Sequence, residues 1–351
     1  MPRGGVDAPT DRRAPSAFRG RGSSHVREDG GMSMTDPLVV AIDLGGSGTR
    51  LVAEGAADGR PVASVSGPPR AASTGVSDDA VADGLTHLAT RLVEQLDQRR
   101  PEIVGVVAGV AGLSSLVKDP VWVRDRLASA FAARDALLAS DMVTAHVGAL
   151  GYAPGAVLAA GTGAVALGTD LDRVWRRVDG WGHLLGDLGS GAWIGMEGLR
   201  AAARGLDGRA APSALSRAAE ARFGPVATWP GQVYPRTDRP RVLGEFAPDV
   251  AAAAEEGDET ARDILRRAAA HLADTLTGAI GDGVPPRIAL TGGLFGMPPA
   301  LLRDPVLAAL RARHPGLEVA ERPGRPLDGA VLLARRLAAG RPVPRVAPFA
   351  C

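Results

Sequence analysis

Two strand–turn–strand segments with glycine-rich turns constrain the fold of this chain more than any other feature. The first, at 39–53, reads VVAIDLGGSGTRLVA: an apolar run leads to Asp43 and then to a turn of glycine and hydroxyl residues. The second, at 155–168, reads GAVLAAGTGAVALG and repeats the pattern of strand, glycine turn and strand. A repeat of this kind indicates an internal duplication, with two similar lobes that each open on a glycine-tipped hairpin.

Apolar runs and amphipathic segments alternate around the two hairpins. Apolar runs predict further strands, and apolar residues at helical spacing predict helices. Beyond the hairpins, strands are expected at 60–67, 102–113, the start of 136–150, and 286–296. Helices are expected at 77–100, with Ser77 as N-cap, at 120–134, at the end of 136–150, in long stretches from about 190 to 281, and at 326–340. The alternation predicts the α/β class with mixed sheets.

The composition excludes several classes of protein. The 351 residues suffice for about two domains, and a formal net charge of +1 gives no reason to expect nucleic acid or an anionic membrane as partner. Cys351 is the single cysteine, which excludes a disulfide framework, a cysteine zinc site and an iron–sulfur cluster held within one chain. Lys118 is the single lysine and no Gly-Lys-Ser/Thr sequence occurs, so there is no Walker A loop.

The first 36 residues differ from the rest of the chain. They are rich in Gly, Pro, Ser, Arg and Asp and lack the apolar stretch of a signal peptide. We interpret residues 1–36 as a disordered extension or as a mis-assigned start, with Met32 or Met34 as the first residue. No run of 18 apolar residues occurs, so no transmembrane helix is expected, and the chain is expected in the cytoplasm.

The glycine turns predict phosphate binding. Consecutive glycines let backbone N–H groups converge on one anion, and the hydroxyls of Ser47 and Thr49 add donors. Asp43 would repel a phosphate unless a cation lies between them, so its expected role is to hold Mg²⁺. A hairpin without ligand is the alternative for either turn alone. A third turn at 292–293 makes phosphate binding the favoured interpretation.

Several motifs resemble those of known phosphotransferases. AIDLGGSGTR, LAAGTGAVALG and IALTGGLFG resemble the two phosphate motifs and the adenosine motif of the sugar kinase, Hsp70 and actin superfamily. GGSGTR, ASDMVTAH, GTGAVA and GWGHLLGDLGSGAWIG resemble its BadF/BadG/BcrA/BcrD ATPase branch, which includes N-acetylglucosamine and glucosamine kinases. The resemblance implies two actin-like (ribonuclease H-like) lobes, 37–145 plus 326–340 and 146–325, with mixed sheets and a central cleft.

The resemblance implies ATP-dependent phosphorylation of an amino sugar at its 6-hydroxyl. Asp141 takes the position of the general base, and a strand-end carboxylate can accept the hydroxyl proton during phosphoryl transfer. The alternative role of Asp141 is a helix N-cap. ATP and Mg²⁺ are the implied cofactors, with Asp43 for the metal. The implied nucleotide-binding residues are Gly45, Gly46, Ser47, Gly48, Thr49, Arg50, Gly161, Thr162, Gly163, Gly292 and Gly293.

The segment DGWGHLLGDLGSGAWIG holds the implied sugar site. Carboxylates accept hydrogen bonds from sugar hydroxyls and aromatic faces contact sugar C–H groups, roles that suit Asp187 and Trp181. The alternative is that Asp187 or Ser190 only caps the following helix, and Trp193 is expected in the core. The implied sugar contacts are Ser114, Ser115, Asp141, Trp181, Gly182, His183 and Asp187, although His183 is equally compatible with a structural role.

The identity of the sugar is less constrained. Glucosamine carries an ammonium group and favours a nearby carboxylate, for which Asp179, Asp187 and Glu197 are candidates. Several N-acetylglucosamine kinases have an asparagine in the loop after the third strand, and SGPPRAASTG has none. The sequence does not place any of these carboxylates near C2 of the sugar. GTGAVALG followed by VDGWGHLLGDLGSGAWIG resembles actinobacterial glucosamine kinases, and this resemblance makes glucosamine the expected substrate, with N-acetylglucosamine as the alternative.

The sequence argues against other functions found in the superfamily. Activators of 2-hydroxyacyl-CoA dehydratases and zinc-containing ROK kinases need cysteines that this chain lacks. A non-catalytic sugar or nucleotide sensor remains an alternative, but it would predict a lost base or a damaged turn. A homodimer is expected by resemblance, with no nucleic-acid or membrane partner.

Overall fold

The described residues form two five-stranded mixed sheets. The computed structural model describes residues 36–45, 48–67, 77–96, 101–321 and 323–351, all of which lie in one compact unit. The predicted extension at 1–36 therefore lies outside the described residues, except for Asp36. The strand order is β3-β2-β1-β4-β5 in the first sheet and β10-β9-β6-β7-β8 in the second.

The two sheets have the same topology. In each, the central strand pairs antiparallel with the next strand of its hairpin and parallel with a later strand. The first sheet contains β1 (Leu38–Gly45), β2 (Gly48–Gly55), β3 (Pro61–Gly67), β4 (Ile103–Val110) and β5 (Ala136–Ser140). The second contains β6 (Gly155–Ala160), β7 (Ala164–Thr169), β8 (Trp175–Asp179), β9 (Arg287–Thr291) and β10 (Glu318–Val319). This confirms the predicted α/β class; the lobe boundaries stay a prediction.

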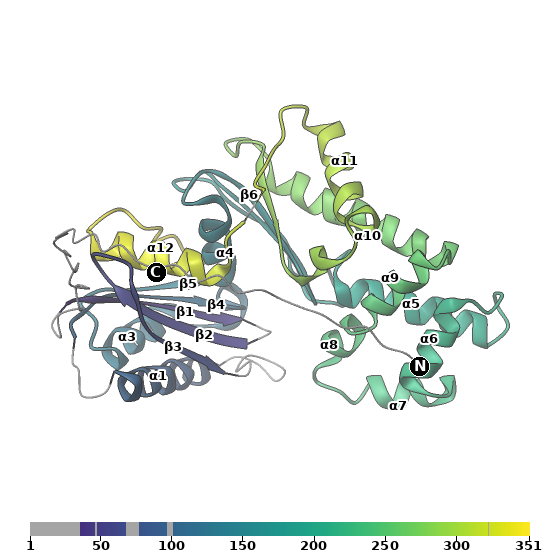
Figure 1. Ribbon diagram of the computed structural model, residues 1–351, viewed down its shortest axis with the longest axis horizontal. Helices are drawn as coiled ribbons and strands as arrows, with labels where there is room; N and C mark the ends of the chain where they lie inside the picture. Colours follow the sequence, from purple (N-terminus) through teal and green to yellow (C-terminus); the bar gives the residue numbers. More distant parts are fainter. Residues whose placement is uncertain (1–35, 46–47, 68–76, 97–100, 322) are drawn as a thin grey trace, which may run out of the picture. The chain divides into compact units, whose positions relative to one another are not determined.

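Helices pack on both faces of each sheet (Figure 1). On the first sheet, α1 contacts β3 and α3 contacts β5, while α12 contacts β1 and β4. On the second sheet, α10 contacts β6, β7 and β8, and α4 contacts β6 and β9. The helices are α1 (Asp78–Gln95), α2 (Leu113–Leu116), α3 (Pro120–Ala130), α4 (Asp141–Leu150), α5 (Gly191–Leu206), α6 (Ala214–Phe223), α7 (Trp229–Val233), α8 (Arg239–Gly244), α9 (Ala247–Glu255), α10 (Glu259–Ala279), α11 (Arg303–Arg313) and α12 (Pro326–Ala338).

Local sequence explains where these elements begin and how they pack. Every residue of β1 from Leu38 to Leu44 is buried, as expected for a central strand that reads as a continuous apolar run. Ser77 caps α1 by accepting a hydrogen bond from the backbone N–H of Ala80, as predicted. α4 and α12 cross closely at two glycines: a Cβ at Gly329 would lie 1.9 Å from the carbonyl oxygen of Thr144, and one at Gly148 2.2 Å from that of Arg325.

The C-terminal segment pairs with the edge of the first sheet, which the sequence did not predict. Leu138 and Cys351 exchange two backbone hydrogen bonds of 3.0 and 2.9 Å, and the N–H of Ser140 donates to the carbonyl of Phe349 at 2.8 Å. The ring of Phe349 stacks on Trp175 of β8, with centroids 5.7 Å apart. The segment therefore supports β5 directly before Asp141.

We expect deletion of residues 343–351 to lower the free energy of unfolding by about 2–4 kcal/mol, because three backbone hydrogen bonds worth about 1 kcal/mol each are lost. Urea denaturation measures the effect. The matched control is Arg345→Ala, which removes an exposed ion pair with Asp135 and should cost less than about 1 kcal/mol. A deletion no more destabilising than this control would contradict a supporting role for the segment.

Candidate functional site

The parallel strands of the first sheet bring Asp43 and Asp141 to one edge. β1 pairs with β4 in a register that places Asp43 beside Gly109, and β4 pairs with β5 so that Gly109 lies beside Ala139. The carboxyl ends of the three strands therefore meet. A Cβ at Gly109 would lie 2.5 Å from Thr144 Oγ1, so this glycine lets α4 approach the sheet closely.

Asp141 is the first residue of α4, and its neighbour Ser140 is the N-cap. Ser140 Oγ accepts a hydrogen bond from the N–H of Met142 and lies 3.3 Å from Asp141 Oδ1. Since Ser140 caps the helix, the capping alternative does not explain Asp141. Burial raises the pKa of Asp141 to about 6, assisted by the negative charge of Asp43 and opposed by the Ser140 and Met142 hydrogen bonds and the positive charge of Arg177. A carboxylate with such a pKa can accept a proton near neutral pH.

Asp43 is buried at the end of β1 beside the first glycine turn. Its Oδ2 lies 3.5 Å from Nη1 of Arg50, the residue opposite it on β2. Burial raises the pKa of Asp43, and the charge and hydrogen bond of Arg50 oppose this. Thr49 Oγ1 is buried and has no hydrogen-bond partner among the described residues, so it is a donor available to a ligand. Gly45 and Gly48 face each other across the turn, whereas Gly46 and Ser47 lie outside the described residues.

The second glycine turn is fixed to the N-terminus of α5. The N–H of Gly191 donates to the carbonyl of Gly161 at 2.8 Å, and the N–H of Ala192 donates to that of Thr162 at 3.0 Å. The N–H of Gly161 bonds to the carbonyl of Gly163 at 2.8 Å, which closes the turn. The first N–H groups of the 16-residue helix α5 are therefore occupied by this turn and by Ser190, and only the positive end of the helix dipole favours an anion beside the turn.

The third turn lies at the same edge of the second sheet. β6 and β9 run parallel, with Ala159 opposite Thr291, so the turns that follow the two strands are neighbours. Gly292 has a φ of 100°, and a Cβ there would lie 2.2 Å from the carbonyl oxygen of Ala160. Gly293 has open space around its Cα, so only Gly292 is required by the fold.

Asp187 lies beside the second turn. Its Oδ1 accepts a hydrogen bond from the N–H of Ala164 at 3.3 Å, and its φ of 54° is unusual for a residue with a side chain. Burial raises the pKa of Asp187; the Ala164 hydrogen bond opposes this and the charge of Asp179 adds to it. Ser190, not Asp187, caps α5.

The other two candidate carboxylates are already engaged. The carboxylate oxygens of Asp179 accept hydrogen bonds from the N–H groups of Asp187 and Leu188, at 2.7 and 3.0 Å. Glu197 forms ion pairs with Arg200 at 2.8 Å and Arg267 at 3.0 Å. Asp187 also accepts backbone hydrogen bonds, from Ala164 and Gly182, but the Ala164 bond of 3.3 Å is longer than either bond of Asp179. We therefore retain Asp187 as the candidate for a sugar ammonium group.

The remaining predicted sugar contacts flank Asp187. Trp181 has 63% of its surface exposed, while His183 is half-buried and Gly182 has a positive φ of 84°. Ser114 lies on α2 and accepts a hydrogen bond from Arg177 at 3.2 Å. The side chain of Ser115 lies outside the described residues. Trp193 is buried, as expected, with its ring edge-on to His271.

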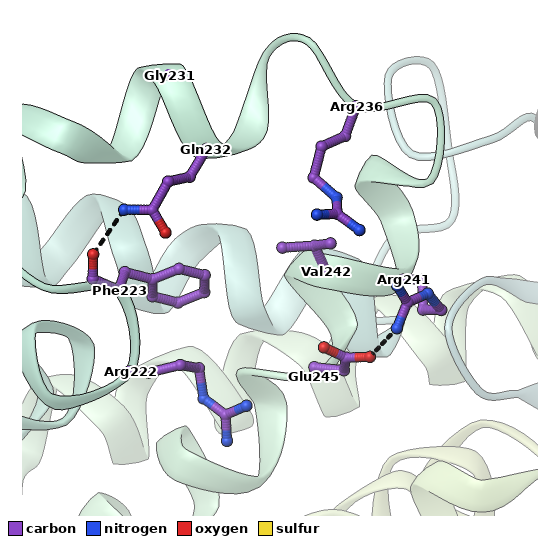
Figure 2. A pocket seen from close by; sticks show the side chains of 8 residues that line it. All are labelled: Arg222, Phe223, Gly231, Gln232, Arg236, Arg241, Val242 and Glu245. Carbon is purple, nitrogen blue, oxygen red and sulfur yellow. Dashed lines mark hydrogen bonds and ion pairs between the residues drawn. The ribbon is translucent and has the colours of Figure 1, made fainter.

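A cavity of about 450 Å³ is lined by none of these residues. Figure 2 shows its walls, which come from α6, α7 and α8 and the chain between them: Arg222, Phe223, Gly231, Gln232, Arg236, Arg241, Val242 and Glu245. Its arginines are paired with Asp238, Asp249 and Glu245, so the cavity has no excess positive charge from them.

The fold, the three glycine turns and the strand-end carboxylates define a nucleotide-binding protein with actin-like topology. The sequence profile of the BadF/BadG/BcrA/BcrD ATPase family matches residues 40–334. The chain belongs to this family, as its motifs predicted. No helix among the described residues combines the length and apolar character needed to cross a membrane.

Individual relatives match over nearly the whole chain. An N-acetyl-D-glucosamine kinase of Dictyostelium discoideum is 25% identical over 323 residues, which are 86% of this chain and 98% of the relative. A solved structure from Chromobacterium violaceum, described as an N-acetylglucosamine kinase, is 28% identical with a TM-score of 0.65 and covers 86% of this chain and 100% of its own. A Porphyromonas gingivalis structure with a TM-score of 0.62 is 18% identical and covers 85% of this chain and 98% of its own, so it supports the fold alone.

Proposed function

We propose that this protein is an ATP-dependent amino-sugar kinase that phosphorylates the 6-hydroxyl of its substrate. The observation that carries the proposal is the pair of strand-end carboxylates, Asp43 and Asp141, with one glycine turn directly after Asp43 and two more at the ends of β6 and β9. A kinase of this kind needs a base for the hydroxyl and fixed donors for the phosphates. The names of the relatives point to the same class of reaction.

In this proposal Asp141 accepts the proton of the sugar hydroxyl as the γ-phosphoryl group arrives. Its raised pKa suits the task, because it is basic enough to take a proton yet is largely ionised at neutral pH. The three turns hold the nucleotide, with Gly45, Gly48, Thr49, Arg50, Gly161, Thr162, Gly163, Gly292 and Gly293 as the described contacts and Gly46 and Ser47 completing the first turn.

The donor set fits a magnesium ion held together with ATP. No cluster of three or more His, Cys, Asp or Glu side chains among the described residues could hold a metal unaided. Magnesium in nucleotide sites commonly uses one or two carboxylates plus phosphate oxygens, and buried Asp43 can be such a carboxylate. When bound, the ion neutralises phosphate charge, while Arg50 restrains the Asp43 carboxylate.

Two sugars are candidates for the phosphoryl acceptor. Glucosamine is the acceptor that the sequence predicts, and the Asp187 carboxylate is available for its ammonium group. N-acetylglucosamine is favoured by the names of the relatives and by apolar surface near Asp187: Trp181, Leu184 and Leu185 are all exposed. The proposed sugar contacts are Ser114, Ser115, Asp141, Trp181, Gly182, His183 and Asp187. A homodimer and a cytoplasmic location stay predictions.

A coupled ADP-release assay with Mg-ATP tests the proposal. Glucosamine, N-acetylglucosamine, glucose and no sugar are compared at equal concentration. Turnover that depends on an amino sugar is expected, and the preferred acceptor decides between the two candidates. If no sugar increases ADP release above the background, the amino-sugar kinase proposal is wrong, and a nucleotide or sugar sensor becomes the favoured alternative.

A further inference from the structure

Arg177 of β8 joins residues that lie far apart in the sequence. Its Nη1 donates a hydrogen bond of 3.2 Å to Oγ of Ser114, which follows β4 of the first sheet. Its Nε donates to the carbonyl oxygen of Asp179 at 3.2 Å, and its Nη2 donates to that of Gly180. One guanidinium therefore ties a loop of the first sheet to the end of a strand in the second.

The turn that Arg177 holds has an unusual backbone. Asp179 and Gly180 have φ values of 60° and 77°, in the left-handed region, which costs free energy for a residue with a side chain such as Asp179. The two carbonyl groups of this turn are those that bond to Arg177. The same turn directs the Asp179 carboxylate to the N–H groups of Asp187 and Leu188, so it shapes the loop that contains Asp187.

Arg177 also supports Trp181. Its guanidinium carbon lies 4.8 Å from the centroid of the Trp181 ring, a cation–π distance. Trp181 is otherwise exposed, and an exposed aromatic ring without a partner can change rotamer. The arginine therefore restricts the ring that is proposed to contact the sugar.

We propose that Arg177 is a positioning residue that joins Ser114 and the 179–181 turn into one wall of the sugar site. The inference rests on the proposed kinase function and assigns a role to a residue that no motif singled out. Through the turn it orients Trp181 and Asp187. The positioning depends on the planar fork of donors, so a substitution that keeps the charge without the fork tests it.

Three variants test the proposal. Arg177→Met removes both the charge and the planar donor set, and it should raise KM for the amino sugar roughly 10- to 100-fold, the size of effect caused by misplaced substrate. The kcat should fall much less than KM rises, because Arg177 contacts the wall of the sugar site and not the reacting atoms. Arg177→Lys keeps the charge but not the planar fork, so KM should remain raised.

Arg176→Met is the matched control. Arg176 is the next residue of β8, it lies in register with Gly168, and its guanidinium lies against Gly281 instead of the sugar site. Both the sugar KM and the kcat of this variant should match those of the wild type. A similar loss in both methionine variants would show a general effect on β8 and would overturn the specific role of Arg177.

Hydrogen–deuterium exchange of the 179–188 segment provides a readout that does not depend on turnover. Exchange should be faster in Arg177→Met than in Arg176→Met, since the turn loses two hydrogen bonds. Unchanged exchange would overturn the proposal. Faster exchange with an unchanged sugar KM would show that Arg177 has only a structural role, and it would also overturn the proposal. Absence of turnover in the wild type would instead overturn the proposed function itself.

Discussion

Replacement of Asp141 by asparagine is expected to lower kcat on the preferred amino sugar by about 10²- to 10⁴-fold, the usual contribution of a positioned general base. Asparagine has nearly the same shape as aspartate but cannot accept the hydroxyl proton. KM for the sugar should change much less than kcat. Steady-state ADP release with saturating Mg-ATP measures both constants.

The same substitution should leave the protein as stable as the wild type or slightly more stable. The folded state raises the pKa of Asp141 to about 6, so ionisation of this carboxylate opposes folding above its unfolded pKa. An uncharged asparagine removes that cost. A large fall in the melting temperature would show that lost activity reflects damaged folding. The control is Asp125→Asn, which changes an exposed side chain on α3 and should retain full activity.

The wild type should lose activity as the pH falls through about 6, because the base is then protonated. Sugar-dependent kcat/KM is expected not to change with pH above neutrality. Well below pH 6 it should decrease about tenfold for each pH unit. Asp43 lies in electrostatic contact with Asp141 and its own pKa is raised too, so the midpoint belongs to the pair of carboxylates. A profile that stays flat down to pH 5 would contradict the assignment of Asp141 as the base.

Much of the fold could be predicted because its central strands are continuous apolar runs. β1, β4 and β5 are almost fully buried, and their sequences contain little except Val, Ala, Leu, Ile and Gly. The glycine turns were equally visible, since a turn that needs close backbone approach leaves few other residue types. Asp141 could be found for a related reason: it is a carboxylate directly after an apolar strand.

Other elements were missed because their sequences carry no such pattern. β8 reads WRRVD, and each of its residues is half-buried, so it has neither an apolar run nor a clear alternation. The C-terminal segment contains Pro342, Pro344 and Pro348, which argue against a strand although its last residues pair with β5. Arg177 was missed because its role depends on contacts with Ser114, which is 63 residues away in the chain.

The roles of the candidate carboxylates also depended on tertiary contacts. Asp179, Asp187 and Glu197 are equivalent candidates in the sequence. Ion pairs engage Glu197, and two backbone N–H groups bond to Asp179 at 2.7 and 3.0 Å, whereas the Ala164 bond of Asp187 is longer, at 3.3 Å. Composition and spacing cannot distinguish these environments, since the partners come from other helices or from the turn geometry of the loop.

Gly292→Ala is expected to lower the free energy of unfolding by about 1–3 kcal/mol, the cost of a strained backbone conformation. The φ of 100° at this position is unfavourable for alanine, and its Cβ would lie 2.2 Å from the carbonyl oxygen of Ala160. Because both Ala160 and Gly292 precede proposed nucleotide contacts, relief of the overlap should displace the second and third turns. KM for ATP should therefore rise as well.

The variant Gly293→Ala distinguishes an effect on folding stability from an effect on nucleotide binding. A Cβ at Gly293 meets no heavy atom of the described structure within 4 Å, so alanine should be tolerated by the folded protein. Urea denaturation without nucleotide should place this variant within about 1 kcal/mol of the wild type, the cost or gain of an ordinary Gly-to-Ala change. If the two variants were equally stable, the close approach of Gly292 to Ala160 would not constrain the turn. If Gly293→Ala alone raised KM for ATP, the open space at Gly293 would be where the nucleotide binds.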